Sequence, residues 1–96
     1  MEIEPKEEQQ IDILEDQDTD ITLASRVVLF NDDWHSFDEV ISQLMKAINC
    51  TYEQGKTFAF EVHVKGKAIV YSGSLKNCLK VTSVLEEIAL HTQIIT

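Results

Sequence analysis

Cysteine, proline and glycine are all scarce in this 96-residue chain, which has two cysteines, one proline and three glycines. Cys50 and Cys78 form neither a CxxC pair nor a disulfide framework, so we expect reduced thiols in a cytoplasmic protein. No apolar run approaches the roughly 18–20 residues that could span a bilayer. The first residues also lack the basic and apolar segments of an export signal. A membrane partner is therefore not expected.

Basic residues are few as well, and the acidic residues that outnumber them are unevenly placed. The chain has 17 acidic residues against 8 lysines and arginines, a net charge of −9. Residues 1–23 contain nine of the acids and one base, which leaves eight acids against seven bases in residues 24–96. We expect 1–23 to be a disordered or loosely attached acidic extension, because it can bury little apolar surface, and 24–96 to form one domain. The absence of a basic stripe argues against a nucleic-acid partner.

The first half of the predicted domain contains a strand and a helix. The β-branched and aromatic run 26–30 predicts a buried strand that stops at the turn-forming Asn-Asp-Asp of residues 31–33. Asp33 is a candidate to cap that turn. Ser36 and Glu39 form a capping-box pattern, and apolar residues then recur at helical spacing. The apolar residues that recur at this spacing are Phe37, Val40, Ile41, Leu44, Met45 and Ile48.

Residues 57–64 are compatible with two structures. Thr51 and Gln54 form a second capping-box pattern, which predicts a helix. From Phe58 to Val64, however, large apolar residues alternate with other residues as they do in a strand, and 65–67 would then be a hairpin turn. The pattern alone does not decide between helix and strand.

The C-terminal third is easier to interpret. Residues 68–71 have the composition of a strand, Ser74 can cap a last helix, and Ile94 with Ile95 indicates a short final strand. The residues expected to face inward from the last helix are Leu75, Cys78, Leu79, Thr82, Leu85 and Ile88.

Four features of the chain resemble the ClpS family when their order and spacing are taken together. A hydrophobic strand runs into Asn-Asp-Asp, a helix follows at once, a Val-His pair stands three residues before Gly-Lys-Ala-Ile, and Lys-Val lies in the last helix. The resemblance covers about residues 26–95 with a single-residue gap. The residues that carry it are Asn31, Asp32, Asp33, Val62, His63, Gly66, Lys67, Ala68, Ile69, Lys80 and Val81.

This resemblance implies an α+β fold in which a three-stranded antiparallel sheet packs against three helices, similar to the C-terminal domain of the ribosomal stalk protein. The family's Val-His pair lies on a helix ended by the glycine, which favours a helix for about 52–65. The implied function is that of an adaptor, not an enzyme. It would bind substrates with a bulky hydrophobic N-terminal residue (an N-degron) and deliver them to a ClpA-like AAA+ unfoldase through its N-terminal domain. We expect a monomer without cofactor or metal.

The resemblance also assigns roles to individual residues. Asn31, Asp32 and His63 would hold the substrate's α-amino group, because an amide oxygen, a carboxylate and a neutral ring nitrogen are the acceptors that a desolvated ammonium needs. Lys80 would contact the unfoldase, although Leu75 stands near where the family places an acidic residue. The residues that would line the hydrophobic pocket are Phe37, Val40, Ala59 and Val62.

Two of these pocket positions depart from the family's pattern. Phe37 stands where a methionine is usual, and Ala59 stands where a methionine commonly gates the pocket. One substitution adds bulk and the other removes it. We therefore expect a changed preference among Leu, Phe, Tyr and Trp, and weaker exclusion of the β-branched Ile and Val.

Other functions fit parts of the sequence less well. Cys50 or Cys78 with His63 could form a nucleophile and base, but neither cysteine has an oxyanion turn nearby. A metal site built from Asp32, Asp33 and His35 lacks matching ligands elsewhere. The main alternative is a non-proteolytic protein-docking module of the ribosomal-stalk type, which does not require the Asn-Asp-Asp and Val-His features.

Overall fold

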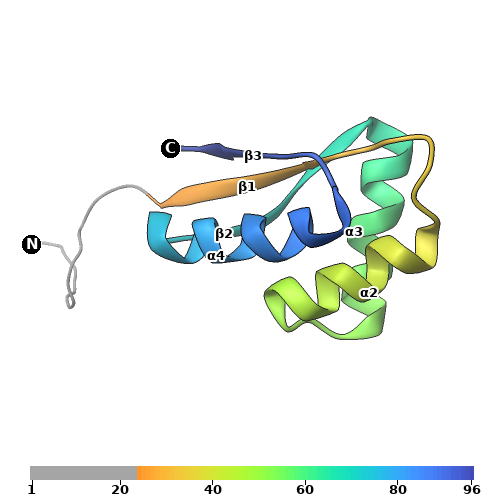
Figure 1. Ribbon diagram of the computed structural model, residues 1–96, viewed down its shortest axis with the longest axis horizontal. Helices are drawn as coiled ribbons and strands as arrows, with labels where there is room; N and C mark the ends of the chain where they lie inside the picture. The colour runs from red at the N-terminus through yellow and green to blue at the C-terminus, as the bar shows by residue number, and fades with distance from the viewer. Residues whose placement is uncertain (1–23) are drawn as a thin grey trace, which may run out of the picture.

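A computed structural model describes residues 24–96 (Figure 1). The expected character of residues 1–23 lies outside the described residues. The elements are β1 (Ser25–Phe30), α2 (Phe37–Ile48), α3 (Tyr52–Lys65), β2 (Lys67–Gly73), α4 (Leu75–Leu85), the 3-10 turn η2 (Glu86–Ile88) and β3 (Thr92–Ile95). The α+β class, with three helices and one three-stranded antiparallel sheet in this part of the chain, is confirmed.

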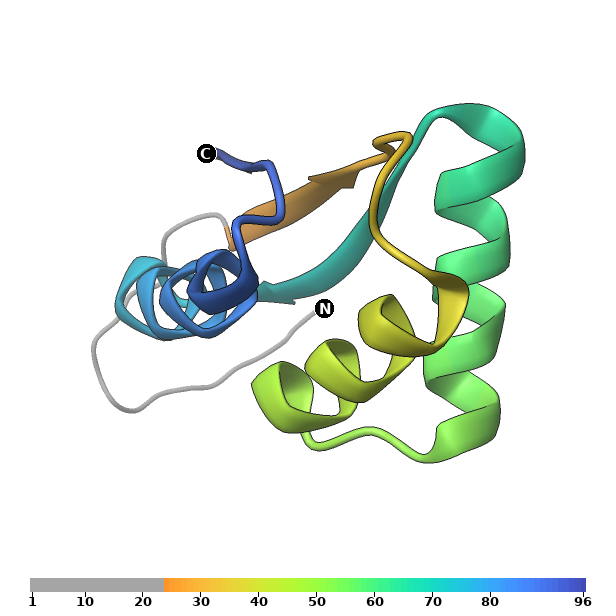
Figure 2. The ribbon, with the colours of Figure 1, turned by 45° about the vertical axis from the view of Figure 1, so that its right-hand side comes forward.

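The sheet has β1 as its central strand, with β2 and β3 antiparallel on either side. Its helices lie on one side of it (Figure 2). A bulge in the β1–β2 ladder shifts the register, so that Val27 pairs with Tyr71 and Val28 pairs with Ile69. Val27 and Leu29 of this central strand are completely buried and belong to the core.

The core fills the space between the sheet and the helices. Burial of a valine or leucine side chain there contributes about 1.5–3 kcal/mol relative to exposure. The buried members of the core come from β1, β2, the three helices and the segment that precedes β3. They are Val27, Leu29, Leu44, Val62, Ala68, Val70, Cys78, Val81, Leu85 and Leu90.

Both expected capping boxes are present. Ser36 accepts a hydrogen bond from the Glu39 backbone while the Glu39 carboxylate accepts one from the Ser36 backbone, and Thr51 and Gln54 do the same at the start of α3. Each pair satisfies two backbone N–H groups that have no partner inside the helix. These exchanges define where α2 and α3 begin.

The helix expected for residues 52–65 is confirmed, and the hairpin turn at 65–67 is wrong. Gly66 ends α3 with φ 88°, and its N–H donates to the Val62 carbonyl at 2.8 Å. The strand-like alternation arose because Phe60 and Val64 are each 61% exposed, so half of the alternating apolar residues face solvent. The buried face of α3 instead uses the small residues Gly55 and Ala59 beside Val62.

The inward face expected for α4 was partly wrong. Cys78, Thr82 and Leu85 are buried as expected, but Leu75 and Leu79 are 50% and 55% exposed. The buried face of α4 also includes Val81. The helix therefore turns a different side to the core from the one that Leu75 and Leu79 predicted. An exposed apolar pair therefore lies on the outer side of α4.

Candidate functional site

The connection from β1 to α2, residues 31–36, is held at three points far apart in sequence. The Phe30 N–H donates to the His91 carbonyl at 3.0 Å, and the Asn31 N–H donates to the Gly66 carbonyl at 2.9 Å. The Nε2 atom of His35 lies 2.5 Å from the Ile88 carbonyl. The loop is thus fixed against the end of α3 on one side and against the segment before β3 on the other.

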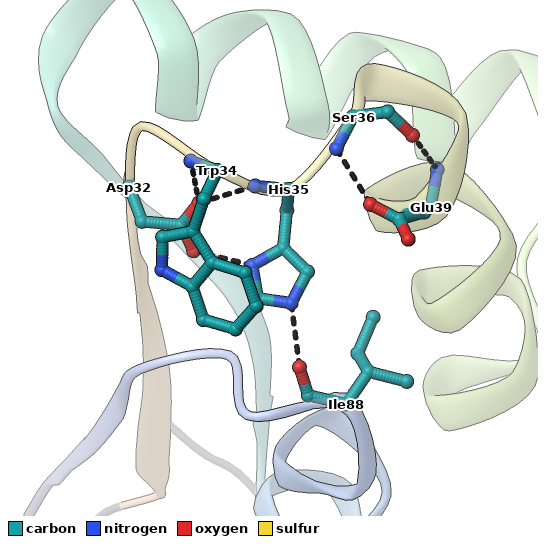
Figure 3. A network of polar contacts seen from close by, with 6 residues as sticks. All are labelled: Asp32, Trp34, His35, Ser36, Glu39 and Ile88. Carbon is teal, nitrogen blue, oxygen red and sulfur yellow. Dashed lines mark hydrogen bonds and ion pairs between the residues drawn. The ribbon is translucent and has the colours of Figure 1, made fainter.

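Asp32 organises the inside of this loop (Figure 3). Its Oδ1 accepts hydrogen bonds from the backbone N–H groups of Trp34 at 3.1 Å and His35 at 2.8 Å. Its Oδ2 lies 2.6 Å from Nδ1 of the His35 ring. The turn is therefore capped by Asp32, and the expectation that Asp33 caps it was wrong. A carboxylate offers about four acceptor positions, so Asp32 retains about one for a ligand.

The two charged partners shift each other's titration in opposite directions. Burial alone would raise the pKa of Asp32, but hydrogen bonds from His35 and Trp34 outweigh burial and lower it below its ordinary value. Burial alone would lower the pKa of His35, but its bonds to Asp32 and to the Ile88 carbonyl raise it. The pair is therefore ionised over a wider pH range than either residue would be alone.

A cavity of about 390 Å³ lies between this loop and α3. Pockets that bind small molecules have volumes of about 300–1,000 Å³. The cavity brings together all seven residues expected to bind the substrate's first residue: Asn31, Asp32, Phe37, Val40, Ala59, Val62 and His63. Its other lining residues are Leu29, Phe30, Asp33, His35, Ser36 and Leu90.

The cavity has an apolar base and a polar rim. Leu29, Ala59 and Leu90 are buried side chains of the base. At the rim, Asn31 and His63 are exposed. An apolar group at the base of this cavity and a polar group at its rim could therefore be bound together.

α3 supplies one wall of the cavity through its helical period. Ala59, Val62 and His63 are spaced i, i+3 and i+4, so they lie on one side of the helix. The Phe37 ring at the start of α2 also lines the cavity and lies edge-on to the His63 ring, with centroids 6.4 Å apart and an interplanar angle of 89°. The wall depends on Gly66, which ends α3 three residues after His63 and whose carbonyl accepts a hydrogen bond from the Asn31 N–H.

Six of the lining residues were not anticipated from the sequence in this role, and Leu29, His35 and Leu90 illustrate why. Leu29 could have been found, because it alternates with Val27 on the strand that precedes the loop. His35 was considered only as a metal ligand, although an aspartate three residues before a histidine in a turn is a signal for pairing. Leu90 carries no local signal, because its place depends on how the chain returns to β3.

The residues of the alternative chemistries can also be placed in the structure. Neither Cys50 nor Cys78 is among the residues that line the cavity, and burial raises the pKa of the Cys78 thiol despite a hydrogen bond to Gly73 that lowers it. Within residues 24–96, no three His, Cys, Asp or Glu side chains lie where they could hold a metal ion. In the same part of the chain, no helix is long and apolar enough to cross a membrane.

Lys80, the residue expected to contact the unfoldase, lies on α4 and is exposed.

Comparison of the architecture with solved structures places it among the ClpS-like α+β domains. The structure of Agrobacterium tumefaciens ClpS2 bound to L-phenylalaninamide superposes with a TM-score of 0.71 at 17% sequence identity, covering 75% of this chain and 94% of that chain. The family model for the ATP-dependent Clp protease adaptor protein ClpS matches residues 23–93. The chain therefore belongs to the ClpS family of adaptor proteins.

Two sequence relatives show how far the similarity extends. The ClpS adapter of Treponema denticola is 35% identical over 60 residues, which are 58% of this chain and 59% of that protein. The human E3 ubiquitin-protein ligase UBR2 is 38% identical over 58 residues, which are 60% of this chain but 3% of the ligase. This chain thus matches less than two thirds of the Treponema adapter and a very small part of UBR2.

Proposed function

We propose that this protein binds the first residue of other proteins when that residue has a free α-amino group and a bulky apolar side chain, and that it delivers them to a Clp AAA+ unfoldase. One observation carries the proposal: a single cavity joins the acceptors of Asn31, Asp32 and His63 to an apolar base. The Agrobacterium relative supports it, because L-phenylalaninamide has a free α-amine and an aromatic side chain.

The polar rim would bind the ammonium group. A cation that leaves water needs hydrogen-bond acceptors around it, since an unpaired buried charge is very unfavourable. The Asn31 amide oxygen, the remaining acceptor position of Asp32 and a neutral His63 ring nitrogen provide three, which matches the three N–H donors of an ammonium. Acetylation of the amine would remove both the charge and two of these donors.

The apolar base would bind the side chain. Burying a leucine or phenylalanine there contributes about 1.5–3 kcal/mol, whereas micromolar affinity requires about 8.2 kcal/mol. The ammonium and the first peptide groups must supply the difference. Binding should therefore depend at least as strongly on the free amine as on the identity of the side chain.

Delivery requires a second surface, for which α4 is our candidate. Lys80 and Lys76 lie next to the exposed pair Leu75 and Leu79 on the outer side of this helix. Residues spaced three or four apart are neighbours on a helix surface, so these four form one apolar and basic face. We propose that this face contacts the N-terminal domain of a ClpA-like unfoldase.

The proposal is tested by titrating the protein with a fluorescent peptide that starts with leucine and with its N-acetylated twin. We expect saturable binding of the free peptide and a loss of roughly 100-fold or more after acetylation, because two or more hydrogen bonds to a charged group are lost. A peptide that starts with aspartate is the control for the apolar base. Equal affinity for the free and acetylated peptides would reject the proposal.

The preference among first residues tests the pocket's departures from the family. Ala59 is buried and lines the cavity, so a ligand side chain that entered the cavity would meet only a methyl group at this position. We expect peptides starting with isoleucine or valine to bind within about tenfold of leucine, and Ala59→Met to widen that gap, since a branched side chain would then meet the added bulk. Equally strict exclusion of isoleucine and valine by both proteins would show that Ala59 does not set the preference.

A further inference from the structure

His35 differs from the other two histidines of the chain in its environment. Its side chain is 3% exposed, whereas His63 and His91 are exposed. Both of its ring nitrogens face hydrogen-bond acceptors: Nδ1 lies 2.6 Å from the Asp32 carboxylate and Nε2 lies 2.5 Å from the Ile88 carbonyl (Figure 3). The ring thus connects the loop to a segment 53 residues further along the chain.

Two acceptors around one imidazole determine its protonation state. A neutral ring has one N–H and one lone pair, so one of its nitrogens would place a lone pair against an oxygen. Only the imidazolium ion can donate to both partners. Asp32 in the loop and Glu39 on α2 are the charged groups that act on the ring, and both favour the cation. The Trp34 ring stacks on it with centroids 3.9 Å apart and an angle of 33°, a further favourable contact for a cation.

We infer that His35, as an imidazolium, is a positioning residue for the amine-binding rim: its Nδ1 fixes the carboxylate of Asp32, and its Nε2 fixes the loop to Ile88. The inference rests on the proposed function of the cavity. Three donors occupy the Asp32 carboxylate, so they fix the direction of its last acceptor position. Without Nδ1 the carboxylate could rotate, and this position would no longer point reliably toward the ligand.

The two ring contacts can be separated by a matched pair of substitutions. The side-chain nitrogen of asparagine lies close to where Nδ1 lies in histidine, and that of glutamine lies close to where Nε2 lies. His35→Asn can therefore keep the bond to Asp32, and His35→Gln can keep the bond to Ile88, while His35→Ala keeps neither. If the role runs through Asp32, the asparagine variant should bind the leucine-start peptide nearly as well as the original protein.

The expected result of fluorescence anisotropy is a loss of at most about threefold for His35→Asn and roughly tenfold for His35→Gln and His35→Ala, the factor that one hydrogen bond to a charged group is worth. Circular dichroism and thermal unfolding verify that each variant is folded. Equal losses for asparagine and glutamine, or a larger loss for asparagine, would overturn the inference, because a merely structural tether does not favour the Nδ1 side.

A second readout needs no peptide. Nitrogen NMR of the histidine rings should show both His35 nitrogens protonated near neutral pH. The fluorescence of Trp34, the single tryptophan of the chain, should rise as His35 loses its proton, because an imidazolium quenches an adjacent indole. A neutral His35 near neutral pH would overturn the inference even if peptides bind. A protonated His35 in a protein that binds no leucine-start peptide would instead contradict the proposed function, and with it the positioning role.

Discussion

The two walls of the cavity are built in different ways. The loop wall, residues 31–36, has no regular backbone hydrogen bonds of its own, so it depends on the Asp32 side chain and on contacts with His91, Gly66 and Ile88. The α3 wall, residues 59–63, lies within a regular helix that begins at a capping box and ends at a glycine. One wall is held by charged and polar side chains, and the other by helix geometry and apolar packing.

This difference has a consequence for how each wall responds to change. Buried backbone groups outside helices and strands must find partners elsewhere, and in the loop wall several of these partners are charged. Its stability should therefore depend on pH. The α3 wall contains no buried titratable group among residues 59–63, so its contribution should depend on volume and backbone conformation instead.

The largest effect is expected when one polar group is removed from each wall. Asn31→Ala and His63→Ala should each weaken binding of the leucine-start peptide roughly tenfold, because each loses one hydrogen bond to the ammonium, and the double variant should bind more weakly than either single variant. Fluorescence anisotropy measures the affinities, and Lys80→Ala on α4 is the matched control that should bind the peptide normally. If one of the two substitutions has no effect, the amine is held by a single wall.

The second effect concerns the apolar packing of the α3 wall. Val62 is buried in the core and lines the cavity, so Val62→Ala should lower the free energy of unfolding by about 2 kcal/mol through lost contacts and a larger cavity. Urea unfolding at about pH 5 and about pH 9 should give the same loss. A loss that changes with pH would show that the two walls are not independent.

The third effect should have the pH dependence that the second lacks. The pKa of His35 is raised above its reference of 6.5. The contribution of the protonated ring to the free energy of unfolding is therefore complete below pH 6.5 and is lost as the pH rises through the higher pKa of the folded protein. The pKa of Asp32 is lowered from its reference of 3.8. The contribution of the ionised carboxylate to the free energy of unfolding is therefore complete above pH 3.8 and is lost as the pH falls through the lower pKa of the folded protein.

Asp32→Asn should accordingly cost about 1–2 kcal/mol of unfolding free energy at about pH 5, where both partners are ionised, and less at about pH 9. Urea unfolding of the two proteins at both pH values measures the difference. Asp33→Asn is the matched control, since the neighbouring carboxylate does not cap the turn. A penalty for Asp32→Asn that is equal at both pH values would argue against an ionic contact.

The smallest of these effects is at the point where the two walls meet. Gly66 has φ 88°, and a side chain there would have open space around it, so Gly66→Ala should cost about 1–2 kcal/mol from backbone strain alone. Thermal unfolding measures this loss. Because the Gly66 carbonyl also holds Asn31, a shift of this turn should weaken peptide binding as well. Unchanged binding in a destabilised Gly66→Ala protein would show that the loop wall keeps its position without this contact.

Much of the fold could be predicted from the sequence because its signals are local. The capping boxes at Ser36 and Thr51 and the strand at 26–30 depend on neighbouring residues, and all three were confirmed. For α3 the periodicity was ambiguous, since Phe60 and Val64 are exposed and the buried positions include a glycine and an alanine. There the family resemblance, not the pattern, gave the correct helix.

The candidate site was predictable only in part, for a related reason. Asn31 and His63 belong to recognisable short patterns, and the fold brings both to one cavity. The contact of His35 with Ile88 and the place of Leu90 at the cavity's base depend on the path of the chain after α4. No local pattern encodes such contacts, because they exist only once the sheet has formed.

The most direct test of the account is to follow backbone and side-chain NMR signals while L-leucinamide, a free amino-acid amide, is added to the protein. We expect the largest shifts at Asn31 and Asp32 on one wall and at Val62 and His63 on the other, with little change along the outer side of α4. Shifts confined to α4 or to the strands, with both walls unchanged, would contradict the claim that this cavity binds a free α-amine and its side chain.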